Sequence, residues 1–283
     1  MAEETNTADD DAAARPRPDK VQVVEGFTIT VDPPLQPIKA LRAGLRLLRN
    51  KEDTAQVFEI TRALSGRSLT RTFRAFAQSA HGRRVLTQGI DLANEFGDFD
   101  RLRSMPEGSF GRAYLDFMES GNLETDGITA VARQTNAAFD FDAYPELTTY
   151  FRYATASHDV WHTLTGYERD ALGELCVLAF TRAQIRNDSL QLIVLMGMMA
   201  LKKENWRVPA IKAIRQAART GRTARWLYGE DLLALLPRPL ADVRDHLNIP
   251  YPETYRQIDR DLRFGLLKPM AKRPASSVAP SGA

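Results

Sequence analysis

The spacing of apolar and polar residues along the chain predicts a protein built almost entirely from helices. In most of the sequence between residues 36 and 265, apolar side chains recur every three to four positions, which places them on one face of a helix. The exception is Val21–Val31, where the pattern is typical of strands and predicts an extended arm or a hairpin. The expected helices cover residues 37–48, 53–64, 68–79, 91–100, 110–119, 145–165, 170–187, 189–203, 209–219, 239–247 and 252–264.

We therefore expect an all-α fold, with a single multi-helix, bundle-like domain. This domain covers residues 36–265, and an extended arm at 21–35 precedes it. Residues 1–20 are acidic and rich in alanine and proline, and residues 266–283 are rich in proline, serine and alanine. Such compositions bury too little apolar surface to fold, so both ends are predicted to be disordered tails.

Two apolar segments have more than one interpretation. Helix 37–48 carries Ile38, Leu41 and Leu45 on one face, and its charged residues are all basic. A basic helix of this kind usually has a solvated face, although it can also lie on a membrane surface. The segment Leu190–Leu201 is too short to span a bilayer. It predicts either a buried helix or the lining of a lipid pocket.

Composition narrows the class of protein. A hydrophobic content of 43% is enough for a substantial core, and a formal charge of +2 gives no indication of nucleic-acid binding. The single cysteine, Cys176, excludes an intramolecular disulfide and fits a reducing compartment. The first residues lack the pattern of a secretory signal or a mitochondrial presequence, so we expect a cytoplasmic protein.

The most informative motif is His158-Asp159-x-x-His162, followed by Glu174. Residues four apart on a helix share a face, so the two imidazoles can bind one metal ion. Asp159 follows His158 at about 100° around the helix. Gly166 and the polar run after it predict a break and a second helix from about residue 170, which could bring Glu174 to the site. Two histidines and two carboxylates suit zinc or iron.

Other interpretations of these residues remain open. The histidines could be ordinary helix residues. A metal phosphohydrolase of the H…HD…D type would need His81 upstream and Asp231 or Asp242 downstream. A zinc protease is disfavoured because Asp159 stands where H-E-x-x-H has its catalytic glutamate.

Three blocks, in order, resemble the Coq-four family of ubiquinone (coenzyme Q) biosynthesis proteins. The central block matches the family motif H-D-x-x-H-x11-E at every fixed position. The segment Pro106–Tyr114 is similar to the family's P-E-G-x-x-G-x-x-Y, and residues 240–249 are similar to its C-terminal helix signature. The resemblance extends from about residue 70 to residue 262.

The resemblance implies an all-helical protein that binds a divalent metal, usually described as zinc, through His158, Asp159, His162 and Glu174. It implies decarboxylation, coupled to hydroxylation, at C1 of a polyprenylated 4-hydroxy-3-methoxybenzoate. The alternative is a non-catalytic, lipid-binding scaffold that organises a ubiquinone biosynthesis complex. The expected partners are the prenylated substrate, other enzymes of the pathway and a second copy in a homodimer. The expected location is cytoplasmic, peripheral on the inner face of the cell membrane.

Residues near the motif are candidates for contacting such a substrate. Arg152 could pair with a carboxylate or a lipid phosphate, or it could be an ordinary surface charge. A prenyl tail gains about 0.8 kcal/mol for each buried CH₂ group, so it needs an apolar groove. Lys202, Lys203 and helix 37–48 could then face anionic headgroups. The aromatic candidates for flanking the ring are Tyr153, Trp161 and Tyr167, and the candidates for lining the groove are Leu195, Met196 and Met199.

Overall fold

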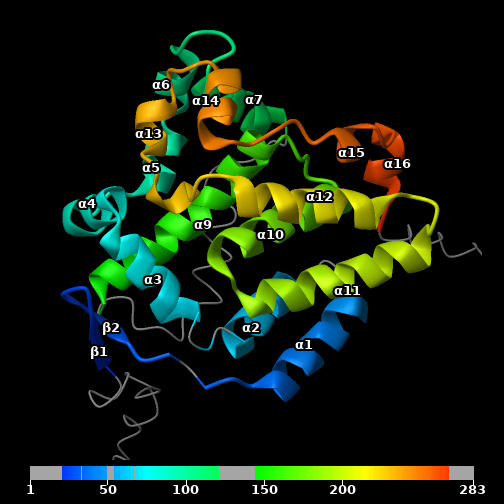
Figure 1. Ribbon diagram of the computed structural model, residues 1–283, viewed down its shortest axis with the longest axis horizontal. Coiled ribbons are helices and arrows are strands. Elements are labelled where there is room, and N and C mark those ends of the chain that lie inside the picture. The colour runs from blue at the N-terminus through cyan, green and yellow to red at the C-terminus, as the bar shows by residue number, and fades with distance from the viewer. Residues whose placement is uncertain are drawn as a thin grey trace, which may run out of the picture.

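The computed structural model describes residues 21–32, 34–49, 54–64, 66, 68–120 and 144–267. Within these residues the chain forms helices and one two-stranded sheet, so the all-α prediction is confirmed. Figure 1 shows the sheet at one edge of the molecule and the helices packed around one another beside it.

The N-terminal strand segment is a hairpin that belongs to the main core. Strand β1 (Val21–Val24) pairs antiparallel with β2 (Phe27–Thr30). The connecting Glu25 and Gly26 both have positive φ, which is typical of the tight turns that match strand twist. Val24 and Ile29 are buried in the main hydrophobic cluster, so the hairpin covers the helices rather than extending away from them.

Helix α9 (Pro145–Thr165) is the longest described helix and lies at the centre of the contacts. Pro145 occupies the first turn, where the missing N–H of proline costs nothing, and Gly166 ends the helix with φ 76°. Its neighbours include four helices: α4 (Ala80–Gln88), α5 (Leu92–Gly97), α7 (Phe110–Ser120) and α14 (Leu240–Leu247). Helix α6 (Phe99–Arg103) packs against α7.

Helices α10 (Ala171–Ile185), α11 (Asp188–Glu204) and α12 (Ala210–Thr223) follow one another and lie side by side in Figure 1. The pair α10 and α12 is closely packed at Gly221, because a Cβ there would lie 2.5 Å from the Phe180 carbonyl oxygen. Helices α1 (Pro37–Arg49) and α2 (Thr54–Leu64) pack against α11 and form a smaller core with it.

The remaining elements close the structure. Helix α3 (Ser68–Gln78) precedes α4, and a short 3-10 helix, η3 (Leu227–Gly229), precedes α13 (Leu232–Leu235). The prediction of a single final helix over residues 252–264 is wrong, because the chain forms two short helices there, α15 (Glu253–Arg256) and α16 (Arg260–Gly265). The break occurs because the Asp259 side chain accepts a hydrogen bond from the Leu262 N–H and begins a new helix.

The last two described residues pack against the fold. Leu266 is buried in the core, and the Leu267 N–H donates to Glu204 Oε1 at 2.8 Å. The tail predicted at 1–20, residues 268–283 of the tail predicted at 266–283, and the helix end expected at Gly121-Asn122 lie outside the described residues. Among the described residues, no helix combines the length and apolar character needed to cross a bilayer.

Candidate metal site

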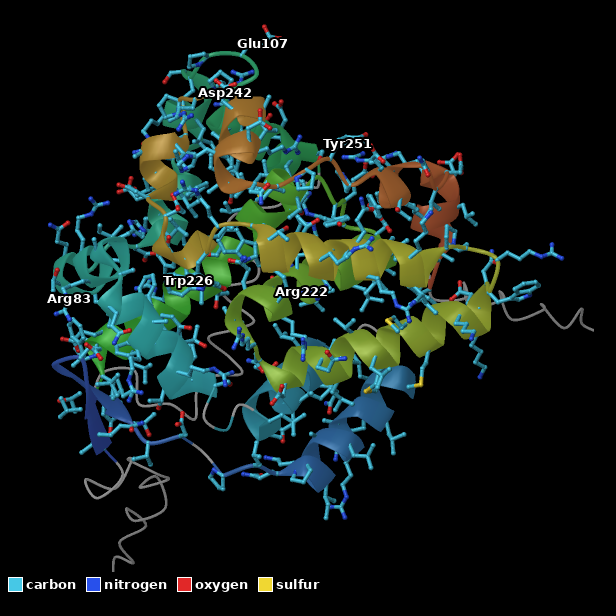
Figure 2. All side chains as sticks on the ribbon, viewed as in Figure 1. Arg83, Glu107, Arg222, Trp226, Asp242 and Tyr251 are labelled. Atoms are coloured by element: carbon cyan, nitrogen blue, oxygen red, sulfur yellow. The ribbon has the colours of Figure 1, made fainter. Side chains whose placement is uncertain are left out.

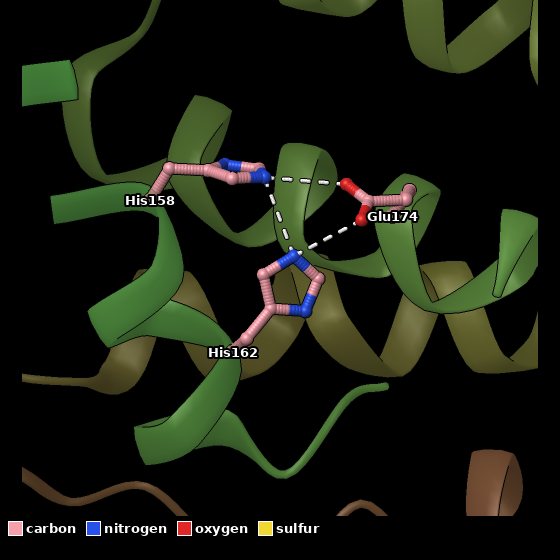
Figure 3. A group of neighbouring side chains, drawn as sticks. All are labelled: His158, His162 and Glu174. Carbon is pink, nitrogen blue, oxygen red and sulfur yellow. Dashed lines mark hydrogen bonds and ion pairs between the residues drawn. The ribbon is translucent and has the colours of Figure 1, made fainter. Parts of the chain in front are cut away.

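The two motif histidines and Glu174 converge at the junction of α9 and α10. His158 and His162 lie one turn apart on α9, and Glu174 lies in the first turn of α10 (Figure 3). The Nε2 atoms of the two histidines are 3.3 Å apart. His158 Nε2 is 3.2 Å from Glu174 Oε2, and His162 Nε2 is 3.4 Å from Glu174 Oε1. Within the described ranges, this is the only group of three or more His, Cys, Asp or Glu side chains whose ligand atoms all lie within 4.8 Å of one another.

These distances fit a small divalent cation. Tetrahedral zinc sites have metal–ligand bonds of about 2.0–2.1 Å, which places neighbouring ligand atoms about 3.3–3.4 Å apart. The three contacts of the cluster, at 3.2–3.4 Å, already have this spacing. The donor types, two imidazole nitrogens and a carboxylate, are those of zinc or iron sites that leave a coordination position open.

His162 is held in the tautomer that a metal ligand needs. Its Nδ1 is 3.0 Å from the Tyr167 carbonyl oxygen, which can only accept a hydrogen bond, so Nδ1 carries the proton. Nε2, the nitrogen that this hydrogen bond leaves available, then faces Glu174 and His158. Phe117 stacks on this imidazole at 5.3 Å, and Arg169 lies over the same phenyl ring at 3.6 Å.

The cluster is electrostatically coupled. Burial favours the neutral form of Glu174, yet hydrogen bonds with His158 and His162 hold the pKa of its carboxyl well below the ordinary value. Burial also opposes charge on His158, but Glu174 and then Asp159 raise the pKa of that imidazole. Without a metal, His158 therefore shares its proton with an ionised carboxylate. A cation can replace that proton, because metal binding releases protons from its ligands.

Asp159, the fourth predicted ligand, is not brought into the cluster. Its side chain is buried, with 7% of the residue exposed. It interacts electrostatically with Tyr114 and Arg169, and it raises the pKa of His158. Asp159 therefore lies beside the three converging side chains and influences them through its charge, without being one of them.

A buried network fixes the start of α10. Asp170 Oδ1 accepts hydrogen bonds from the N–H groups of Leu172 and Gly173, both at 3.1 Å, as an N-cap does. Its other oxygen accepts from the Tyr255 hydroxyl and from Arg263 Nη1 at 3.2 Å. Because Glu174 is one residue beyond this anchored turn, the network sets the position of its carboxylate.

The predicted contact residues on α9 have other partners. Arg152 pairs with Asp91 at 2.9 Å, and the Tyr153 hydroxyl is 3.0 Å from His81 Nε2. Trp161 is buried and packs edge-to-face on Tyr228. These contacts correspond to the surface-charge and packing alternatives.

The other predicted contact residues also have different surroundings. The ring of Tyr167 packs against Tyr255, and it is the backbone carbonyl of Tyr167 that reaches His162. Met196 packs where Gly44 of α1 approaches α11. Leu195 and Met199 lie on the surface, 43% and 55% exposed, rather than lining an enclosed channel.

The residues needed for a phosphohydrolase site are only partly assembled. His81 Nδ1 lies 3.9 Å from Asp231 Oδ1, and Arg84 binds the same carboxylate. Neither His81 nor Asp231 joins the group formed by His158, His162 and Glu174. The described residues therefore do not bring the H…HD…D set around one ion.

Sequence reasoning missed several residues that shape the site. Phe117 stacks on His162, Arg169 lies over the Phe117 ring, and Tyr255 and Arg263 hold Asp170. Arg169 lies in the polar run that marked the helix break, which was the only available signal. The others are 45 to 93 residues from their partners in sequence, and no local pattern indicates such pairings.

Fold and site together define a helical protein with a two-histidine, one-carboxylate cluster between consecutive helices. A family model, Coenzyme Q (ubiquinone) biosynthesis protein Coq4, matches residues 35–253. The chain therefore belongs to this family of ubiquinone biosynthesis proteins, and the resemblance noted from the motifs is confirmed.

Individual relatives agree with this assignment. The chain is 29% identical over 171 residues to "Ubiquinone biosynthesis protein COQ4 homolog, mitochondrial" of Bos taurus, covering 60% of this chain and 62% of the relative. It is 30% identical over 151 residues to "Ubiquinone biosynthesis protein COQ4, mitochondrial" of Coprinopsis cinerea, covering 53% of this chain and 48% of the relative. The match thus spans less than two thirds of these proteins.

A solved structure shares the fold. The crystal structure of a putative ubiquinone biosynthesis protein from Nostoc punctiforme superposes with a TM-score of 0.56 at 16% identity. The match covers 76% of this chain and 99% of that one. At this level of identity the likeness shows the fold alone.

Proposed function

We propose that this ubiquinone biosynthesis protein is a metal-dependent enzyme that acts on a polyprenylated 4-hydroxy-3-methoxybenzoate. It would remove the C1 carboxylate and place a hydroxyl group at C1. The observation that carries the proposal is the convergence of His158, His162 and Glu174 at metal-ligand spacing, with His162 fixed by the Tyr167 carbonyl. Membership of the family supplies the pathway.

The proposed cofactor is a divalent cation, zinc or iron, held by these three side chains. When bound, it would supply a Lewis acid that neutralises the substrate carboxylate. The ionised Glu174 and the oriented Nε2 of His162 provide the binding groups. Arg169 interacts electrostatically with Asp159 and Glu174 and so offsets part of their negative charge beside the cluster.

The overall reaction balances with dioxygen as the oxidant. The bond between C1 and the carboxylate breaks, carbon dioxide leaves, and a carbon–oxygen bond forms at C1. The ring loses two electrons, which dioxygen accepts together with two protons to leave as hydrogen peroxide, and water supplies the hydroxyl oxygen at C1. An ionised 4-hydroxyl group, para to C1, raises electron density at that carbon and favours the substitution. Phe117 covers the His162 imidazole, which is only 1% exposed, and so limits water at this side of the cluster.

The proposal extends to location and partners. A polyprenyl chain cannot remain in water, so the enzyme would meet its substrate at a membrane. We place it as a peripheral homodimer on the inner face of the cell membrane, in contact with other enzymes of ubiquinone biosynthesis. The alternative, a non-catalytic scaffold, shares this location but does not need the metal cluster.

The test replaces His158 or Glu174 by Ala in cells that lack their own homologue. We expect loss of bound metal and of ubiquinone, with the protein still folded. His246→Ala is the matched control, because His246 also pairs with a carboxylate, Glu230, at 3.1 Å, but among the described residues this pair belongs to no three-residue cluster of metal-ligand type. This variant should retain both metal and ubiquinone. Full ubiquinone levels in the metal-free, folded His158 variant would refute catalysis and favour the scaffold.

A further inference from the structure

Helices α1, α11 and α12 share an outer surface, which we call the three-helix face. They lie side by side in Figure 1, and α11 contacts both of the others. Large apolar side chains are exposed on α1 and α11, with 43% to 68% of each residue accessible: Ile38, Leu41, Leu45, Leu195 and Met199. Exposed apolar groups that gather in this way usually mark a binding surface.

The apolar residues of the two helices lie on the same side. Gly44 of α1 approaches Met196 of α11, and the two helices run in the same direction in Figure 1. Around α1, Leu41 and Leu45 lie about 60–100° from Gly44. Around α11, Met199 and Leu195 lie about 60–100° from Met196, in the opposite sense. Because the two helices are parallel, side chains displaced in opposite senses from their line of contact point to the same outer side of the pair. The result is a continuous apolar ridge.

A row of cations follows the neighbouring helix. Four basic residues of α12, the first of them Lys212 and the last Arg222, are separated by three, four and three positions, which places them on one face of the helix. All are exposed, and within the part of the chain that the structure describes none has an ion pair or a side-chain hydrogen bond. The helix contains no acidic residue to balance them. The row consists of Lys212, Arg215, Arg219 and Arg222, the last of which is labelled in Figure 2.

A cavity of about 510 Å³ lies between α11 and α12, beside this row. Met198 and Ile211 contribute apolar surface, and Trp206, 73% exposed, is at its edge. Its other lining side chains include four cations: Lys202, Lys212, Arg215 and Arg219. Cations around an apolar floor match a phosphate ester that carries a hydrocarbon chain.

We propose that the three-helix face docks on an anionic bilayer. The apolar ridge enters the interfacial region, the cations of the cavity bind phosphate headgroups, and Trp206 lies at the level of the headgroups. This inference deepens the proposed function and rests on its peripheral location at a membrane, because it names the surface responsible. It does not depend on the metal chemistry.

A second copy of the chain fits this face less well. In a symmetric dimer the same patch meets itself, so the unpaired cations of α12 would come close to those of the partner. Like charges brought together across an interface cost free energy. An anionic lipid surface pairs with these cations and also accepts the apolar ridge.

The experiment is vesicle flotation of the full chain. Wild type should float with vesicles of phosphatidylcholine mixed with phosphatidylglycerol and much less with phosphatidylcholine alone. Arg215→Glu/Arg219→Glu should reduce the partition coefficient at least about 30-fold. Each arginine near the membrane surface contributes about 1 kcal/mol of attraction to anionic lipid, and losing about 2 kcal/mol in total corresponds to this factor. Leu41→Ser/Met199→Ser should also weaken binding without changing the charge. Inorganic phosphate at equal ionic strength should not prevent flotation.

The matched control is Arg74→Glu/Arg238→Glu, an equal charge change at two exposed arginines without ion pairs among the described residues. It should float like wild type. An equal loss in this control, unchanged flotation of Arg215→Glu/Arg219→Glu, or no flotation of wild type would overturn the proposal. So would a change in oligomeric state with normal flotation, which would identify an interface between copies. Metal content, measured in parallel, should stay unchanged, so this failure is distinct from failure of the metal site.

Discussion

At the scale of single residues, the orientation of His162 is set by the protein rather than by an ion. The Tyr167 carbonyl fixes its Nδ1, Phe117 covers its ring, and only 1% of its side chain is exposed. Glu174, by contrast, has a side chain that is 40% exposed. The site therefore combines a preoriented imidazole with a more accessible carboxylate. Because the position of His162 is already fixed, we expect the affinity for a metal ion to depend strongly on the charge state of His158 and Glu174.

That charge state predicts a pH dependence. The pKa of His158 is raised by Glu174, so the His158–Glu174 attraction stabilises the metal-free fold fully below about pH 6.5 and is lost as pH rises through the folded-state pKa. The pKa of Glu174 is lowered, so its contribution is present above about pH 4.5 and does not change in this range. Zinc must displace the His158 proton. The increase in Tm on adding zinc should therefore grow as pH rises from about 5.5 to about 8.

The measurement is thermal unfolding of metal-free and zinc-loaded protein at several pH values. In the Glu230→Gln variant, which removes a charge paired with His246 and Arg225 outside the cluster, the same trend should persist. A zinc effect that is independent of pH would show that His158 gives up no proton to the metal.

Spacing predicted part of this site and could not predict the rest. His158, His162 and Glu174 follow from an i,i+4 pair and a second helix that folds back, which are local properties. Asp159 is displaced around the helix by one residue and interacts with Arg169 and Tyr114, which local spacing does not reveal. The Tyr167 carbonyl is a backbone atom, and no side-chain pattern indicates its role.

At the scale of elements, the turn between α9 and α10 carries the geometry. Gly166 ends α9 in the left-handed region, and Asp170 caps α10. Both signals are visible in the sequence, and they placed this boundary within about a residue. The segment Ala80–Gln88 was missed although Ser79 caps it and Gly89 ends it, because Ser79 had been assigned to the preceding helix. Its partners in the core determine that it forms a separate helix.

Gly173→Ala tests how tightly this turn constrains α10. A Cβ at position 173 would meet the Glu168 carbonyl oxygen well inside contact distance, and a backbone atom cannot move aside cheaply. Alanine normally favours a helix over glycine by about 1 kcal/mol, so the expected loss of about 1–3 kcal/mol reverses the usual sign. Because the clash would displace Glu174, zinc affinity should fall as well.

The readout is denaturant unfolding together with a competitive zinc titration. Gly265→Ala is the control, since a Cβ there meets nothing within 4 Å, and it should leave both quantities nearly unchanged. If Gly173→Ala raised the free energy of unfolding, the close approach of Glu168 would not constrain the turn.

At the scale of the whole molecule, the orientation of α1 shows what periodicity leaves open. The pattern gave the helix and its amphipathic character, but the small residues Ala40, Ala43 and Gly44 face the core, and Ile38 and Leu41 face outward. Close approach to α2 and α11 needs small side chains, and that requirement exists only once the helices are packed. An amphipathic helix therefore need not bury its larger apolar face.

The same scale decides what a bound ion does to stability. The cluster joins α9, which contacts much of the main core, to α10, which packs on α11 and α12. An ion held there binds only the folded state, so it stabilises by RT ln(1 + [L]/Kd), or about 2.7 kcal/mol at a free concentration of 100 Kd. We expect EDTA to lower the Tm of the metal-loaded protein, and zinc to restore it, in one cooperative transition. Glu174→Gln keeps the size of the side chain but removes its charge, so it should abolish the response to both reagents. A Tm that EDTA and zinc leave unchanged in the wild type would mean that the three side chains hold no ion, and the proposed metal dependence would fail with it.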